Sequence, residues 1–321
     1  MLGLVFTLVA SLAWGQSYEV LLGELSRKVA LQDAQVRDLE AKLDDHPASR
    51  MLDVSDVCQG RLTLTSGTPV TTGDVTNAGT IYFTPFRGSK ISLYNGTYWV
   101  LHDFTERSLA LSVTSGSVYD VFIYNNSGTL TLELSAAWSS TTVRTDALTM
   151  VDGIYVKSGA TTRRYLGTIV ASASNATTDS ASSRLVWNYY NRVRKTFSVS
   201  DGTSTWNYTT ASWRSSNNST ANRINYVGGI AESRLTLLYT QLLTTTGTVY
   251  TGLCEDCTNG YNYSPVGTFA QASMGGGNRH VALFNRNLFT GSHYVQSTEY
   301  GGTSTTFYGQ GGHAIIGDVD C

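Results

Sequence analysis

Hydrophobic residues recur every seven positions between residues 18 and 44. One series is Leu22, Val29, Val36 and Leu43, and the other is Tyr18, Leu25 and Leu39 with Gln32 in the remaining place. A narrow stripe with a 3.5-residue period and charged flanks is typical of a coiled-coil seam. The pattern therefore predicts a helical stalk that oligomerises through these eight residues. The alternative interpretation is an amphipathic helix that lies on its own domain.

The period changes to two after Pro47, which ends the helical pattern. Alternating hydrophobic and polar positions predict β-strands with one buried face. Asn95-Gly96, residues 125–128 and Asp152-Gly153 each separate two such runs, as the turns of β-hairpins do. No later segment has a helical period longer than a turn or two. The predicted fold class is therefore mainly β: an N-terminal α-helical coiled-coil stalk followed by two β-sandwich or jelly-roll-like domains.

The predicted boundaries follow these changes of pattern. They give an apolar N-terminal anchor (1–16), a coiled-coil stalk (17–46), a linker (47–57), a fibre-like β domain (58–195) and a C-terminal β domain (196–321). Residues 275–312 contain glycine runs and read as rich in loops.

Residues 1–16 form an apolar run without Lys or Arg. The run is too short to span a bilayer. Two interpretations stay open, a secretory signal peptide and an uncleaved segment that docks into a larger assembly, and we favour the second.

The charge balance, 22 basic against 24 acidic residues, gives no electrostatic reason to expect a nucleic-acid partner. The four cysteines, Cys58, Cys254, Cys257 and Cys321, are too few for a disulfide scaffold of this size. We expect disulfides, either by local closure of Cys254 with Cys257 or between chains, with Cys321 at a free end able to reach another subunit. Three intramolecular connectivities are possible.

Six segments stand out between residues 60 and 195. They are residues 61–70 (RLTLTSGTPV), 80–86 (TIYFTPF), 91–99 (ISLYNGTYW), 118–122 (VYDVF), 159–168 (GATTRRYLGT) and 187–193 (WNYYNRV). In this order they resemble a module common in tailed-bacteriophage virion proteins, which are described as tail-fibre-like or structural. The resemblance implies a β-rich module in a phage appendage, carries over no catalytic residue, and favours a homotrimer.

Candidate chemistry is sparse. The five histidines have no paired metal spacing, and we predict no metal or cofactor. His102 and Asp103, beside Glu106 and Arg107, read as a solvated strand end. Glu299 with Asp318 and Asp320 would suit a glycosidase only if two carboxylates lay about 5–10 Å apart.

Aromatic residues give the better functional indication, because aromatic rings on a rigid sheet stack on sugar faces. Trp99 and Trp187 are expected to pack internally. In the C-terminal region the candidates for glycan contact are Tyr261, Tyr263, Tyr294, Tyr300 and Tyr308. Trp206, Tyr208 and Trp213 lie in the same region.

The sequence therefore predicts a structural, non-enzymatic appendage of a phage virion, a tail, neck or head fibre on the extracellular particle. Its expected partners are two further copies of the chain, other virion proteins through residues 1–16, and a host-surface glycan. The alternative is a secreted or surface-displayed bacterial adhesin with a cleaved signal peptide. A polysaccharide-degrading enzyme is the third class considered.

Overall fold

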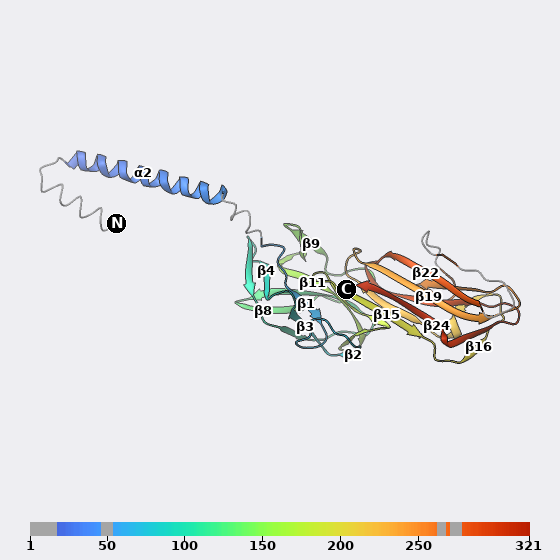
Figure 1. The fold of residues 1–321 in the computed structure, drawn as a ribbon. Coiled ribbons are helices and arrows are strands. Elements are labelled where there is room, and N and C mark those ends of the chain that lie inside the picture. The colour runs from blue at the N-terminus through green and yellow to red at the C-terminus, as the bar shows by residue number, and fades with distance from the viewer. Residues whose placement is uncertain (1–17, 46–53, 262–267, 270–277) are drawn as a thin grey trace. The chain divides into compact units, whose positions relative to one another are not determined.

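The computed structural model describes residues 18–45, 54–261, 268–269 and 278–321, and the chain divides into two compact units, Met1–Val54 and Ser55–Cys321. The described part of the first unit is helix α2, Tyr18–Asp45 (Figure 1). Glu19 lies in its first turn and Lys42 in its last, and both charges are favourable to the helix dipole. Lys42 also pairs with Asp38 one turn earlier, with 2.7 Å between Nζ and Oδ2.

The predicted coiled-coil stalk is wrong. Among the described residues α2 is a single helix, and four of its hydrophobic seam residues are exposed, from 42% at Leu22 to 64% at Leu39, whereas Leu25 is half-buried. Val20 and Leu31, which lie outside the heptad series, are 48% and 60% exposed. A 3.5-residue period departs from the true helical period by only about 20° per heptad, so over 28 residues it does not distinguish a seam from the stripe of a lone helix. The side chains of Tyr18 and Leu43 lie outside the described residues.

The second unit is built of β-strands, so the mainly β part of the fold prediction is confirmed. A three-stranded sheet contains β1 (Gly60–Thr63), β3 (Thr80–Pro85) and β6 (Arg107–Ala110), and a two-stranded sheet contains β4 (Lys90–Tyr94) and β5 (Trp99–Asp103). A six-stranded sheet contains β15 (Arg194–Ser200), β16 (Thr205–Asn207), β19 (Arg234–Thr244), β21 (Thr268–Phe269), β22 (Asn278–Asn287) and β24 (Thr306–Asp320). Figure 1 shows β15, β24, β19 and β22 side by side in this sheet.

The largest sheet has 13 strands, ordered β17-β23-β18-β13-β12-β11-β10-β9 along its main path. Its strands are β2 (Val75–Ala78), β7 (Val118–Asn126), β8 (Thr129–Leu134), β9 (Leu148–Val151), β10 (Ile154–Lys157), β11 (Ala160–Ala173), β12 (Ala176–Ser180), β13 (Ser183–Arg184), β14 (Val186–Asn188), β17 (Trp213–Ser215), β18 (Arg223–Gly228), β20 (Tyr250–Glu255) and β23 (Gly291–Tyr300). A short 3-10 helix, η1 (Ser216–Asn218), follows β17.

The three predicted hairpins are present. β7 and β8 meet at Ser127-Gly128, and β9 and β10 at Asp152-Gly153, and in both turns the two central residues have positive φ, as a type I′ turn requires. The hairpin of β4 and β5 differs from the prediction, because Tyr94 pairs with Trp99 and the connection is four residues long. There Asn95 Oδ1 accepts hydrogen bonds from the backbone amides of Thr97 and Tyr98, at 2.9 and 3.0 Å.

Strands β7 and β11 form a layer between two hydrophobic cores. Phe122 and Tyr165 point into one core, and Val121 and Leu166 point into the other. The first core continues to Tyr226 of β18 and to the six-stranded sheet, so the C-terminal half has two sheets facing each other across it. Strand β13 also pairs in parallel with β18 across the boundary predicted at residue 196. Both predicted β ranges therefore lie in one compact unit.

The prediction that residues 275–312 are rich in loops is wrong, because the described part of this range contributes β22, β23 and the start of β24. Strand β23 escaped detection because four consecutive polar residues, 296–299, are fully buried in it. Most of their polar groups are hydrogen-bonded to other parts of the unit, so burial does not require hydrophobic alternation there.

Trp187 tests the shared core. Its ring is fully buried and its Nε1 donates to Ser233 Oγ at 3.1 Å. Trp187→Ala is expected to lower the free energy of unfolding by about 4 kcal/mol, measured by urea denaturation, because it removes a large buried side chain. Tyr98→Ala is the control, because Tyr98 is 62% exposed. An equal effect of the two substitutions would contradict this assignment of the core.

Candidate functional site

Strand β23 organises the candidate site. Along one edge it pairs with β17 and then β18, and along the other edge it pairs with β20. Tyr300 has two direct cross-strand partners, Trp213 on β17 and Tyr250 on β20. Because directly opposed residues project to the same face of a sheet, these three rings share one face.

The three side chains, which we call the aromatic row, are in mutual contact. The ring centroid of Tyr300 lies 5.7 Å from that of Trp213 and 5.4 Å from that of Tyr250, and the Trp213 and Tyr250 centroids are 6.3 Å apart. All three side chains are half-buried. The row is therefore a compact aromatic surface that retains access to solvent.

A loop that begins with a disulfide lies on the same face. Cys254 and Cys257 are bonded, with 5.3 Å between their Cα atoms, and residues 254–261 form what we call the disulfide loop. The hydroxyl of Thr298, which is next but one to Tyr300 and faces the same way, donates to the carbonyl of Gly260 at 2.8 Å. Tyr261 then follows, and its ring centroid is 4.8 Å from that of Trp213. The loop thus adds a fourth aromatic ring.

The opposite face of β23 fixes the position of β17. Glu299, fully buried, accepts hydrogen bonds from Arg214 Nε and Trp206 Nε1, both at 2.8 Å. Burial raises the pKa of Glu299 above its usual value, although these two hydrogen bonds act in the other direction. Since Arg214 is the neighbour of Trp213 on a strand of only three residues, this ion pair holds Trp213 opposite Tyr300.

The structure brings together two of the five tyrosines predicted to contact glycan, Tyr261 and Tyr300. Tyr294 lies on the same face of β23, six residues from Tyr300, with the Arg223 guanidinium 4.6 Å from its ring centroid. Tyr308 lies on β24 in the six-stranded sheet, and Tyr263 lies outside the described residues. All of those described except Tyr261 are on strands rather than loops, which corrects the prediction. Tyr250 was missed, although it begins a short β-like run, YTGLC.

Between the two sheets of the C-terminal half lies a buried polar network. Burial favours the neutral form of His313 and lowers the pKa of its imidazole to about 4, and its Nε2 lies 2.9 Å from Ser297 Oγ. Burial would raise the pKa of Asp201, but hydrogen bonds from Asn222, Thr203 and Asn217 outweigh it and lower this pKa to about 2. Asn222 donates both to Asp201 and to the backbone carbonyl of Ser216, as expected in a structural network.

Two of the acidic residues considered for a glycosidase mechanism, Glu299 and Asp318, lie in different sheets. Glu299 belongs to the 13-stranded sheet, whereas Asp318 belongs to the six-stranded sheet and pairs with Arg194 at 2.7 Å. Near His102, Glu106 accepts hydrogen bonds from Ser66, Gly67 and Thr84 and so anchors a loop. In the part of the chain that the structure describes, no group of three or more His, Cys, Asp or Glu side chains is placed to hold a metal ion.

The two remaining cysteines are free and buried. Cys58 is 8% and Cys321 3% exposed, and burial raises the pKa of each thiol to about 11. The predicted local closure of Cys254 with Cys257 is confirmed, because the two are bonded. The prediction that Cys321 sits on a free end is wrong, because its side chain is buried.

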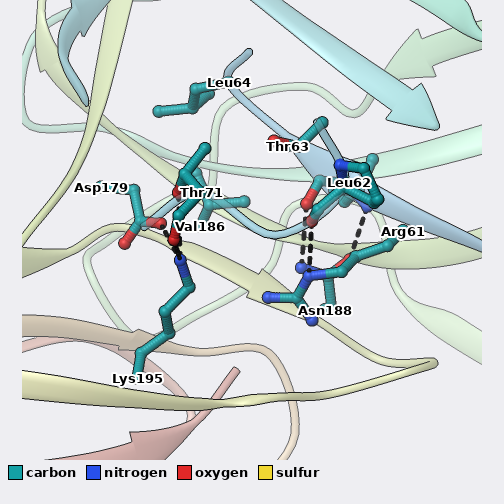
Figure 2. Close-up of a pocket in the computed structure, with 10 residues that line it drawn as sticks. Arg61, Leu62, Thr63, Leu64, Thr71, Asp179, Val186, Asn188 and Lys195 are labelled. Carbon is teal, nitrogen blue, oxygen red and sulfur yellow. Dashed lines mark hydrogen bonds and ion pairs between the residues drawn. The ribbon is translucent and has the colours of Figure 1, made fainter. Parts of the chain in front are cut away.

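Two cavities were considered as alternative sites. Figure 2 shows the smaller one, where Lys195 Nζ donates to Thr71 and lies 3.4 Å from Asp179, and Asn188 bonds to both backbone groups of Leu62. Its volume, about 10 Å³, suits one water molecule, so these residues join strands β1, β12, β14 and β15 rather than hold a ligand.

The larger cavity is an open groove of about 410 Å³ lined by Leu148, Tyr155 and Ile230 among others. Arg144, on its wall, is paired with buried Asp120 at 2.8 Å. The groove therefore presents mainly apolar surface. The aromatic row with the disulfide loop is the better candidate, because it combines aromatic rings with several hydroxyl groups.

No protein-family model and no characterised protein matches the sequence of this chain. The resemblance to a phage virion module therefore rests on the six segments themselves. No helix among residues that the structure describes has the length and apolar character to cross a membrane.

The Arg214–Glu299 pair gives a direct test of how the row is held. Arg214→Ala leaves a buried carboxylate without its cation, and we expect a loss on the order of 3 kcal/mol in the free energy of unfolding. In a Glu299→Gln background the same substitution is expected to cost about 1 kcal/mol or less. A double-mutant cycle in urea measures the difference, and purely additive effects would contradict the pairing.

His313 makes stability depend on pH. The unfolded chain binds a proton at this imidazole below about pH 6.5, whereas the folded chain does so only below about pH 4. The contribution of His313 to the free energy of unfolding, about 3 kcal/mol, is therefore fully present above pH 6.5 and is lost as the pH falls to 4. His313→Gln should remove this slope from urea unfolding curves, and His102→Gln should keep most of it. An unchanged slope in His313→Gln would contradict the assignment.

Proposed function

We propose that this chain is a structural, non-enzymatic protein of a tailed-phage particle, and that the C-terminal half of its β unit contacts the host surface. The observation that carries the proposal is the aromatic row, which presents partly exposed rings on the outer face of its sheet. On the inner face, the bond between Arg214 and Glu299 holds the strands in place. Half-exposed aromatic clusters on rigid strands are typical of binding surfaces.

The six segments that resemble the phage module support the assignment to a particle. They supply strands β1, β3, β4, β7, β11 and β14 and the turns beside them, and most of their hydrophobic residues enter the two cores. The resemblance thus covers one packed arrangement rather than scattered surface positions.

The non-enzymatic role is supported by the positions of the acidic candidates. Each of three carboxylates has its own structural partners: Glu299 bonds to Arg214 in the interior, Asp318 to Arg194 in the six-stranded sheet, and Glu106 to Ser66 in a loop. Each of these contacts accounts for its carboxylate without a substrate.

Two parts of the prediction stay predictions. Residues 1–16, expected to dock into the particle, lie outside the described residues. The homotrimer now rests only on the resemblance, because the predicted coiled coil of residues 18–44, which also favoured an oligomer, is wrong.

Immunogold electron microscopy with antiserum against the full chain tests the proposal. We expect label on phage particles, and we expect the soluble full-length chain to slow adsorption of those particles to host cells by competition. Tyr98→Ala should compete as well as the natural chain, because Tyr98 is exposed in the connection between β4 and β5, which form a separate sheet. Label on bacterial surfaces, on a chain that lacks residues 1–16, would contradict the proposal and favour the adhesin.

A further inference from the structure

We propose that the aromatic row and Tyr261 form a stacking site for a neutral saccharide, and that the Cys254–Cys257 disulfide holds one side of this site in place. The inference deepens the proposed function, because it names the class of host-surface molecule that the C-terminal half would contact. The site itself stands on the geometry of four rings.

The size of the surface fits one sugar ring. The centroids of the row lie within 6.3 Å of one another, and Tyr261 extends the surface 4.8 Å beyond Trp213. Trp213 and Tyr250 come from the two strands that flank β23, yet their rings approach each other over Tyr300. The rings are tilted by 33° to 72° to one another, so they offer ring faces in several directions rather than a flat stack.

The chemistry of the surface favours a saccharide. The face of an aromatic ring is electron-rich and attracts the C–H bonds on the apolar side of a sugar ring. Three of the four side chains are tyrosines, whose hydroxyls both donate and accept hydrogen bonds, as sugar hydroxyls require. Apolar surface with a few polar groups at its rim is the usual composition of a small-ligand site.

The charge distribution favours a neutral saccharide over an acidic one. The four side chains that form the site carry no charge at neutral pH. The adjacent guanidinium of Arg214 points to the other face of the sheet, where Glu299 neutralises it. An acidic sugar would thus gain no partner from Arg214, and its carboxylate would lose hydration.

The disulfide loop determines where Tyr261 lies. The disulfide closes the start of the loop, residues 254–257, next to β20, and the Thr298 bond to Gly260 holds its far side on the face that carries the row. Reduction leaves the loop with more conformations, so Tyr261 meets Trp213 less often and the saccharide loses one of its contacts. Binding is therefore expected to weaken, but not to vanish, when the disulfide is removed.

The test uses the full-length chain on a printed array of neutral gluco-, galacto-, manno- and N-acetylglucosamine oligosaccharides and of sialylated ones. The strongest neutral hit is then titrated by isothermal titration calorimetry, which does not depend on the tryptophan in the site. We expect Trp213→Ala and Tyr300→Ala to bind at least about tenfold more weakly, since they remove central anchors. Cys254→Ser combined with Cys257→Ser is expected to bind about threefold more weakly. Tyr98→Ala is the matched control and should bind as the natural chain does.

Each variant is checked by its melting curve, and Trp213→Phe, which keeps a ring, should recover most of the affinity if Trp213→Ala is poorly folded. An array with no neutral hit, a preference for sialylated sugars, or equal losses in Tyr98→Ala and Trp213→Ala would overturn the saccharide site. These outcomes are separate from those of the particle labelling, because binding to the array does not depend on whether the chain belongs to a phage particle.

Discussion

The ion pair between Arg214 and Glu299 is the interaction on which the candidate site depends. It joins the three-residue strand β17 to the neighbouring strand β23, and Glu299 is almost entirely removed from water. A carboxylate buried in this way is tolerated only when its partners remain in place. The pair therefore fixes the register of β17 on β23, and this register sets Trp213 beside Tyr300 on the outer face. The ion pair on the inner face and the aromatic row on the outer face both result from the pairing of β17 with β23.

The same reasoning extends to the rest of the β unit. Strands β7 and β11 separate two cores, and the first core joins the half that resembles a phage module to the half that carries the aromatic row. Most buried polar groups between the C-terminal sheets are hydrogen-bonded, so this half gains a defined geometry without a fully hydrophobic interior. The row is thus presented by a rigid support, which limits the entropy lost when a ligand binds.

Much of the fold was predictable from local patterns. Gly128 and Gly153 mark two turns that need positive φ, and the alternation from Arg234 onward predicts β19. The spacing of Cys254 and Cys257 indicated a local disulfide. Strand β23 was not predictable, because its buried residues are polar and their partners are distant in sequence. The aromatic row was not predictable either, because it exists only through the pairing of three strands that are separate in the sequence. The heptad pattern misled because a lone helix of this length satisfies it equally well.

Hydroxyl-radical footprinting of the full-length chain tests the central claim most directly, because it measures how accessible each ring is in solution. The account predicts that Trp213, Tyr250 and Tyr300 are oxidised much faster than Trp187, which is fully buried, and that reduction of the Cys254–Cys257 disulfide raises the rate at Trp213 as Tyr261 moves away. Rates at the aromatic row as low as the rate at Trp187 would contradict it, because the row would then be part of the interior and not a surface for binding.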